Sequence, residues 1–278
     1  MKSRYTVLVL FFILNYGSIF GQSKAFNVKV SGKGEPVLLF PGFTCTAQVW
    51  EETIAAISAN HECHAFTFAG FGGVPAIEMP WLPTIKDEVL AYIRQNKLNK
   101  PIIIGHSLGG TLGMWLAATE PTLFKKLVVV DGLPCTGALM IPNFKTSDMM
   151  YDNPFSKQQL AMDSISFRKM SSQMAFGMCM NKAKHEQLIN WMTIADRKTY
   201  VYGYIDMLKL DLREDLAWIQ IPVVVLAATF PSKQIVEKTW DSQLAKLNNK
   251  VIHYADNSAH FIMYDQPEWF LNKIKENL

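Results

Sequence analysis

The stretch Pro101-Ile-Ile-Ile-Gly-His-Ser-Leu-Gly-Gly110 decides the fold of this chain. Its apolar run at residues 102–104 predicts a buried strand, and a run typical of a helix follows at residues 111–119. The turn between them has the pattern Gly-x-Ser-x-Gly, whose glycines permit a sharp bend and close backbone packing. Such a turn pushes the serine hydroxyl out at the carboxyl edge of a sheet. Ser107 is therefore predicted to be a nucleophile, although an isolated match to this pattern is also found in ordinary strand–turn–helix units.

Strand and helix signals alternate on both sides of this turn. Short apolar runs that end in Gly, Pro or Asp predict strands, and amphipathic runs between them predict helices. The predicted strands lie at residues 26–30 (an edge strand), 37–40, 63–68, 102–104, 127–130, 223–227 and 250–254, and the clearest helices at residues 49–57, 84–95 and 111–119. This alternation predicts the α/β class, with a mostly parallel, doubly wound sheet covered on both faces.

Composition and charge exclude several kinds of function. The 278 residues are 49% hydrophobic and 18% charged, and the net charge of +3 is spread without a basic stripe. We therefore expect no nucleic-acid partner. The four cysteines show neither a Cys-x-x-Cys motif nor a metal-ligand spacing, so we expect no metal site. Their favoured interpretation is that of small buried hydrophobic residues, with disulfides as the alternative.

The first residues have the features of a secretory signal peptide. Lys2 and Arg4 precede an apolar run at residues 5–20, and the small residue Gly21 follows it. We expect cleavage near Gly21, export of the mature chain to a periplasm or to the outside, and no stable membrane insertion afterwards. An uncleaved anchor is the main alternative, although the run is short for a membrane-spanning helix.

About ninety residues before the strand at 223–227 contain no strand signal. Helix-like runs at residues 157–177, 184–195 and 199–210 predict a helical cap at residues 133–218, inserted into a core domain of residues 22–132 and 219–278. Ten of the fourteen methionines lie in this region. Three of them, at a spacing of four residues, share one helix face: Met170, Met174 and Met178. They either pack the cap onto the core or form a deformable wall for an apolar substrate.

A serine nucleophile needs a base and two hydrogen-bond donors for the oxyanion. His260 lies in a polar loop just after the last predicted strand, which a doubly wound sheet brings to the same carboxyl edge as Ser107. The Leu108 N–H follows the nucleophile and is the first expected donor. The second is the Phe43 N–H, in the loop after the strand at 37–40. His106 belongs to the turn itself, and we expect its side chain to point away from the serine.

With these residues in place, the chain resembles the α/β-hydrolase superfamily over residues 25–278, in particular members with a helical cap between strands six and seven. The resemblance implies a Ser–His–acid triad and no cofactor. Besides Ser107 and His260, the stretches that carry it are Gly32-Lys-Gly-Glu-Pro-Val-Leu-Leu-Phe-Pro-Gly-Phe43, Leu127-Val-Val-Val-Asp131, Asp211-Leu-Arg213 and Ile219-Gln-Ile-Pro222. Two small departures are Pro41, where the family often has histidine, and Thr67, where an acid is common.

A larger departure concerns the acid of the triad. In the family it usually follows strand seven, but the corresponding loop at residues 227–233 has no carboxylate before Glu237. Asp131, at the end of the strand at 127–130, is the favoured substitute, because some family members supply the acid from this strand. An aspartate there also caps turns, so a structural role is the competing interpretation. Glu237, Asp256 or no acid at all are the remaining alternatives.

The sequence therefore predicts a serine hydrolase that cleaves an ester, thioester or amide of a small to medium apolar acyl substrate, with esterase activity favoured. Dehalogenases and epoxide hydrolases of the superfamily have aspartate at the nucleophile position, so Ser107 argues against both. Carbon–carbon hydrolase, aminopeptidase and haloperoxidase chemistry would retain the serine. The alternative from another class is a catalytically silent protein that binds an apolar ligand under the cap.

Overall fold

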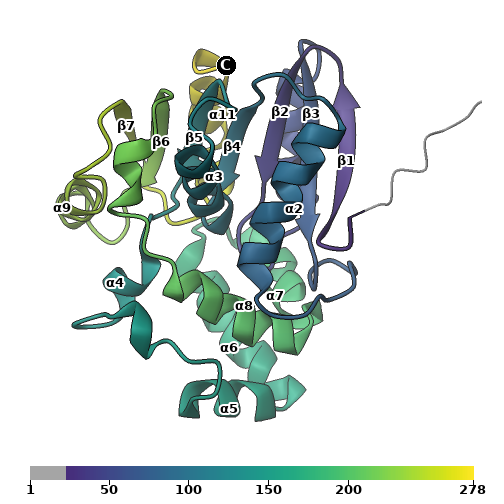
Figure 1. Ribbon diagram of the computed structural model, residues 1–278. Helices are drawn as coiled ribbons and strands as arrows, with labels where there is room; N and C mark the ends of the chain where they lie inside the picture. Colours follow the sequence, from purple (N-terminus) through teal and green to yellow (C-terminus); the bar gives the residue numbers. More distant parts are fainter. Residues whose placement is uncertain (1–22) are drawn as a thin grey trace, which may run out of the picture.

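A seven-stranded sheet forms the centre of the computed structural model, which describes residues 23–278 (Figure 1). The predicted signal peptide at residues 1–21 lies outside the described residues, so export stays a prediction. The strands are β1 (Phe26–Gly32), β2 (Glu35–Phe40), β3 (His61–Phe68), β4 (Ile102–His106), β5 (Lys126–Val130), β6 (Val223–Ala228) and β7 (Lys250–Ala255).

The sheet is mostly parallel, as predicted. Its strand order is β1-β3-β2-β4-β5-β6-β7, and only the edge strand β1 runs antiparallel to its neighbour. Register aligns Leu39 of β2 with Ile104 of β4, and Ile104 with Val128 of β5. The central strands are apolar throughout because both of their faces are covered by helices. The topology places the ends of β2, β4, β5 and β7 at one edge of the sheet.

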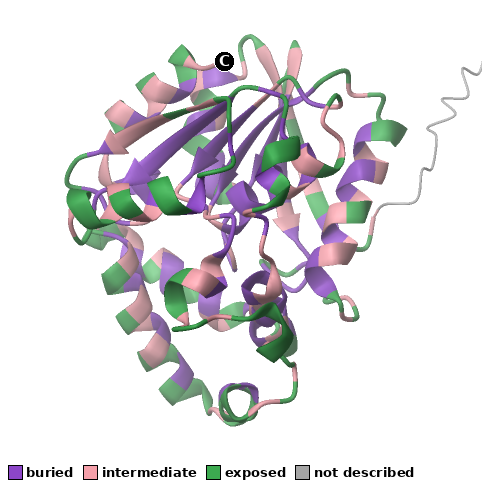
Figure 2. Cartoon of the chain, turned by 60° about the vertical axis from the view of Figure 1, so that its left-hand side comes forward, coloured by how far each residue is buried: buried purple, intermediate pink, exposed green. Residues whose placement is uncertain are grey.

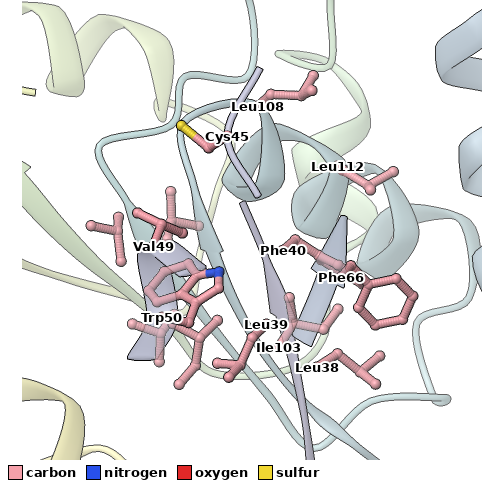
Figure 3. Packing of buried hydrophobic residues seen from close by; sticks show 14 of the residues in the cluster. Leu38, Leu39, Phe40, Cys45, Val49, Trp50, Phe66, Ile103, Leu108 and Leu112 are labelled. Carbon is pink, nitrogen blue, oxygen red and sulfur yellow. The ribbon is translucent and has the colours of Figure 1, made fainter. Parts of the chain in front are cut away.

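Helices cover both faces of the sheet (Figure 1). The helices and short 3-10 turns of the core are η1 (Ala47–Trp50), α1 (Glu51–Ile57), α2 (Trp81–Gln95), α3 (Leu108–Thr119), α9 (Lys233–Gln243), α10 (Ile262–Asp265) and α11 (Pro267–Glu276). On one face, the Phe40 ring packs edge-on against Phe66, with ring centroids 4.9 Å apart. Figure 3 shows Trp50 on the opposite side of the strands from Phe66, where it stacks on Phe270 of α11.

The segment between β5 and β6 contains helices and no strand, as expected from the sequence. Its elements are α4 (Thr136–Met140), η2 (Thr146–Asp148), α5 (Pro154–Ala161), α6 (Ser164–Met178), η3 (Lys182–Lys184), α7 (His185–Ile194), α8 (Arg197–Lys209) and η4 (Asp215–Trp218). We call residues 133–218 the helical insertion. It lies between the fifth and sixth of the described strands, and Figures 1 and 2 show it below the sheet.

The single helix-like run predicted at residues 157–177 was wrong. Two helices, α5 and α6, occupy this region and are separated at Met162 and Asp163, which have extended backbones. The Asp163 carboxylate accepts hydrogen bonds from the N–H groups of Ile165 and Ser166 and so caps the start of α6. A capping aspartate inside an otherwise helical pattern was the signal for this break.

A buried carboxylate joins the helical insertion to the core. Asp206 of α8 accepts hydrogen bonds from the backbone N–H groups of Trp81 and Leu82, at distances of 2.7 and 3.2 Å. These are the first residues of α2, whose N–H groups have no acceptor within their own helix. Tyr151 of the insertion donates to the other oxygen of Asp206. The start of α2 is therefore fixed by the insertion and not by a local cap.

All four cysteines are buried and unpaired, which confirms their interpretation as small buried hydrophobic residues. Burial raises the pKa of the Cys63 thiol to about 11, so this side chain stays protonated. Among residues 23–278, no helix combines the length and apolarity needed to cross a bilayer.

Candidate active site

Ser107 stands on a sharp turn between β4 and α3. Its backbone has φ 53° and ψ −120°, a conformation rare for any residue with a side chain. Gly109 makes the turn possible, because a Cβ at that position would lie 2.2 Å from the backbone oxygen of Phe40. Gly105 has the same function on the other side, where a Cβ would lie 2.2 Å from the Gly109 oxygen. Both glycines let helix, strand and turn approach closely, as the sequence pattern indicates.

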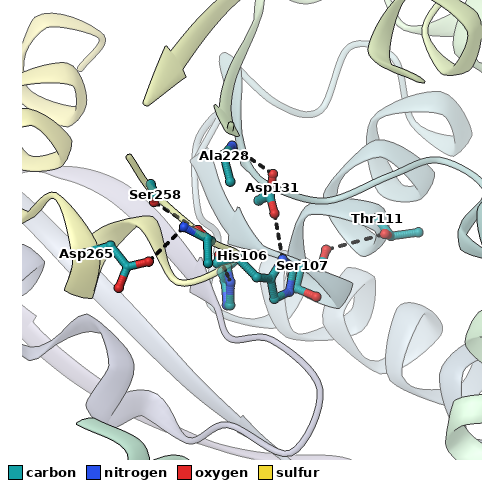
Figure 4. A network of polar contacts seen from close by, with 9 residues as sticks. His106, Ser107, Thr111, Asp131, Ala228, Ser258 and Asp265 are labelled. Atoms are coloured by element: carbon teal, nitrogen blue, oxygen red, sulfur yellow. Dashed lines mark hydrogen bonds and ion pairs between the residues drawn. The ribbon is translucent and has the colours of Figure 1, made fainter. Parts of the chain in front are cut away.

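The structure brings Asp131 and His260 together across 129 positions of sequence. Figure 4 shows the Asp131 carboxylate beside Ala228. The His260 Nδ1 atom lies 2.7 Å from Asp131 Oδ2, at the ends of β7 and β5 respectively. Asp131 has φ 49°, which aspartate tolerates better than most residues. Its other oxygen accepts a 3.0 Å hydrogen bond from the Ala228 N–H. With one oxygen held by Ala228, the second is aimed at the imidazole.

The other two carboxylates considered from the sequence lie elsewhere. Asp256 is on the surface, 3.7 Å from the Lys233 ammonium group. Glu237 belongs to α9 and does not line the cavity that contains Ser107 and His260. Asp131 is thus the carboxylate that contacts the His260 imidazole.

Ser107 and His260 line the same cavity, but within residues 23–278 no hydrogen bond joins the serine hydroxyl to the imidazole. Hydrogen bonds of this kind are often loose in a free enzyme and shorten when substrate binds. Nδ1 of His260 faces Asp131, so its Nε2 atom is the nitrogen free to accept the serine proton.

The two N–H groups expected to bind the oxyanion make no hydrogen bond within the described chain. Leu108 occupies the first position of α3, where the preceding chain offers no helical carbonyl to its N–H. In the described chain the Phe43 N–H donates to no acceptor, and Phe43 lines the cavity. The carbonyl of Gly42 accepts from the Cys45 N–H, which closes the turn that presents Phe43.

His106 is fully buried beside the site, with its ring centroid 4.7 Å from that of His260. Its Nε2 atom lies 3.0 Å from the backbone oxygen of His260, so this nitrogen carries the hydrogen and donates it. Burial, reinforced by the nearby His260, holds the pKa of His106 well below its ordinary value. The neutral ring therefore supports the loop that carries the proposed base, a role that the sequence did not suggest.

We expect the stability of the protein to fall as the pH drops from 7.5 to 5.5. His106 takes up a proton near pH 6.5 when the chain unfolds but stays neutral when folded, so the unfolded state binds more protons. One such group contributes about 1 kcal/mol to this loss. Urea unfolding of His106→Gln, in which an N–H donor is retained, is expected to show a pH dependence smaller by that amount. The pH dependence that remains in this variant includes the contribution of His64, because burial lowers the pKa of that side chain as well. An unchanged slope in His106→Gln would contradict this assignment.

A second residue that the sequence analysis missed is Asp265, which holds the His260 loop against the helical insertion. One of its oxygens accepts a 2.8 Å hydrogen bond from the Ala259 N–H (Figure 4). The other accepts from the N–H groups of Met180 and Asn181, just after α6. The available signal was an aspartate five residues after His260, at the end of a short helix. The carboxylate couples the position of His260 to that of the insertion.

A cavity of about 590 Å³ opens beside these residues, within the range of small-molecule sites. Ser107, Asp131 and His260 line it from the sheet edge, and further walls come from helices α4 to α8, from the loop after β2 and from the region around α9. Met170, Met174 and Met178 line the cavity and also pack against the buried hydrophobic cluster, so both interpretations of the methionine stripe stay predictions. Among the described residues, no group of His, Cys, Asp and Glu side chains is arranged to hold a metal ion.

The protein family of this chain is identified by a match that covers most of its length. Residues 37–273 match the model of the Alpha/beta hydrolase family. The chain belongs to this family. The fold and the resemblance expected from the sequence are thereby confirmed, including the strand–turn–helix unit around Ser107.

Curated relatives of this alpha/beta hydrolase include esterases and other hydrolases. A pimeloyl-[acyl-carrier protein] methyl ester esterase of Aeromonas salmonicida is 29% identical over 114 residues, which are 39% of this chain and 42% of the relative. The match thus spans less than half of that relative. The Vibrio cholerae esterase of the same name is 23% identical over 71% of this chain and 76% of its own length. A putative carbamate hydrolase of Serratia proteamaculans is 31% identical over 38% of this chain and 42% of its own.

Solved structures share the fold of this alpha/beta hydrolase at low sequence identity. A hydrolase from Pseudomonas aeruginosa superposes with a TM-score of 0.75 at 16% identity, over 90% of this chain and 93% of its own. An esterase from Exiguobacterium antarcticum gives a TM-score of 0.75 at 14% identity, over 91% and 94% of the two chains.

Proposed function

We propose that this alpha/beta hydrolase is a serine esterase that forms an acyl-enzyme on Ser107. The observation that carries the proposal is the 2.7 Å contact between Asp131 and His260, beside a serine on a strained turn in the same cavity. Nucleophile, base and acid lie at the ends of β4, β7 and β5, although they are 24 to 153 positions apart. Residues that serve only the packing of the fold have no reason to converge in this way.

The mechanism follows from these positions. His260 Nε2 takes the proton of the Ser107 hydroxyl while Oγ attacks the carbonyl carbon of the ester. The N–H groups of Phe43 and Leu108 hold the negative oxygen of the tetrahedral intermediate. His260 then returns the proton to the departing alcohol, and the acyl group remains on Ser107. A water molecule, deprotonated by His260, attacks the acyl-enzyme and releases the carboxylic acid. Asp131 fixes the tautomer of His260 and stabilises its charged form throughout.

Esters of apolar groups are the substrates that the cavity suits best. Methionine, leucine and aromatic side chains dominate its walls, and among the described lining residues none is lysine or arginine. Esters are favoured over amides because an alcohol departs more readily than an amine. Related proteins named as esterases support the same choice. In this proposal the helical insertion is a cap that excludes water from the reacting atoms.

Pre-steady-state kinetics with p-nitrophenyl esters test the proposal. We expect a burst of p-nitrophenol close to one equivalent, because acylation of Ser107 releases the phenol before water completes the cycle. Mass spectrometry after treatment with a fluorophosphonate is expected to place the label on Ser107. A protein that binds apolar ligands without catalysis would give neither burst nor label, and that result would overturn the proposal.

A further inference from the structure

An unpartnered polar side chain lies in the apolar wall of the cavity. Gln159 of α5 is only 6% exposed and lines the cavity. In the described chain, its Oε1 atom is buried without a hydrogen-bond partner. Most buried polar groups in proteins are paired, and an orphaned amide oxygen is unfavourable unless something outside the chain supplies the missing donor. Gln159 therefore needs an explanation that the fold itself does not provide.

The position of Gln159 is fixed by contacts of its backbone. Arg197 donates hydrogen bonds from Nη1 to the carbonyl oxygens of Gln159 and Met162, at 3.1 and 2.9 Å. The guanidinium group in turn stacks on the Phe167 ring, 3.6 Å from its centroid. These contacts hold the end of α5 in place, so Gln159 lines the cavity from a fixed point of the backbone.

Helix α5 lies at the end of the molecule farthest from the sheet in both views (Figures 1 and 2). The cavity thus reaches from Ser107 at the sheet edge to Gln159 in the helical insertion. Methionine and leucine side chains of α6 and α7 line the same cavity, including Met170, Met174 and Leu188. An apolar chain would suit these walls, with a polar group at its end beside Gln159.

Two tyrosine side chains of the insertion also line the cavity, and their hydroxyls already donate hydrogen bonds. The hydroxyl of Tyr200 donates to the sulfur of Met174 at 3.5 Å, and that of Tyr204 to the sulfur of Met140 at 3.0 Å. Burial raises the pKa of Tyr200 to about 12, so its hydroxyl stays neutral. Because no described lining residue is lysine or arginine, a carboxylate or phosphate at this end would lie unpaired. The chemistry of the wall suits a neutral group that donates a hydrogen bond.

We propose that Gln159 is a specificity-determining residue that binds a neutral hydroxyl or amide N–H at the far end of an apolar arm of the ester. This inference rests on the proposed esterase activity and deepens it. The arm fills the methionine-lined part of the cavity, and its terminal group donates a hydrogen bond to Gln159. The distance from the ester to the terminal group is set by the fixed positions of Ser107 and Gln159, so one chain length is preferred.

Two series of esters test the inference. One contains p-nitrophenyl alkanoates of four to twelve carbons with and without a terminal hydroxyl, and the other contains butyrate esters of alkanols and of the matching diols. For each length, kcat/KM of the hydroxylated ester is divided by that of its plain partner. In the wild-type protein we expect this ratio to reach a maximum of about 10 at one chain length in one of the series.

The variant Gln159→Leu keeps the approximate volume of the side chain and removes its amide. We expect the maximum to disappear, because a leucine side chain cannot accept the hydrogen bond of the terminal hydroxyl. Gln159→Met serves the same purpose if the leucine variant does not fold. Because the ratio compares two substrates of one variant, a general loss of activity cancels. A flat ratio in the wild-type protein, or a maximum that survives in both variants, would overturn the inference. Absence of turnover for every plain ester would instead contradict the proposed esterase activity.

Discussion

Replacing Ser107 by alanine is expected to lower kcat for a p-nitrophenyl ester by about 10⁴- to 10⁶-fold. The alanine variant lacks the oxygen that attacks the carbonyl, so no acyl-enzyme forms, and only the oxyanion donors and binding remain to act on a water molecule. Serine and alanine both have a Cβ, so alanine at this position adopts the φ of 53° at a similar steric cost. We therefore expect the variant to fold. Steady-state kinetics, together with circular dichroism of the purified protein, measure both effects.

Ser242→Ala is the matched control, because Ser242 is an exposed serine on α9, away from the cavity. It should retain wild-type rates. If Ser107→Ala kept more than a tenth of the wild-type kcat, the nucleophile would have to be another group.

Replacing Asp131 by asparagine is expected to lower kcat by about 10³- to 10⁴-fold with little change in KM. Asparagine adopts the left-handed backbone at this position as readily as aspartate, and its amide oxygen can still accept the Ala228 N–H. Its amide nitrogen would then face His260 Nδ1 and donate to it. This forces the proton of the imidazole onto Nε2, the atom that must accept the proton of Ser107. The fold is retained while the base is held in the wrong tautomer.

Two conservative variants serve as controls for this experiment. Glu237→Gln and Asp256→Asn remove the carboxylates that the sequence left as alternatives, and neither of these contacts His260. Both should cleave esters at wild-type rates. A loss of activity in Glu237→Gln comparable to that expected for Asp131→Asn would show that the acid has been assigned to the wrong residue. Equal activity in all three variants would show that a Ser–His pair suffices.

Local patterns were enough to predict most of the fold. Each central strand is a short apolar run closed by a turn residue, so its position follows from burial on both faces and needs no knowledge of the neighbours. For the elements of the core, predicted and observed boundaries differ by at most three residues, as at α2, which begins at Trp81 and not at residue 84. The start of this helix is stabilised by Asp206, 125 positions away, and nothing near Trp81 in the sequence marks it.

The helical insertion was predicted less well, because helices there are held by contacts with the core and with each other. The break between α5 and α6 depends on the single capping residue Asp163, which a helical pattern on both sides obscured. Likewise, the unpaired amide of Gln159 and the link from Asp265 to the His260 loop exist only after the chain has folded. Hydrogen bonds between distant residues leave no local trace in composition or periodicity.

The sequence by itself determined the sharp turn that carries Ser107, because this turn needs Gly105 and Gly109 within four residues of chain. It also favoured His260, after the last strand, as the proposed base, since the carboxyl ends of parallel strands meet at one edge. Only the tertiary structure decided that Asp131 contacts His260, because β5 and β7 are separated by β6 and by the whole insertion. That contact depends on the orientation of two side chains across the sheet edge, which is set by the Ala228 N–H and the folded loop and not by spacing in the chain.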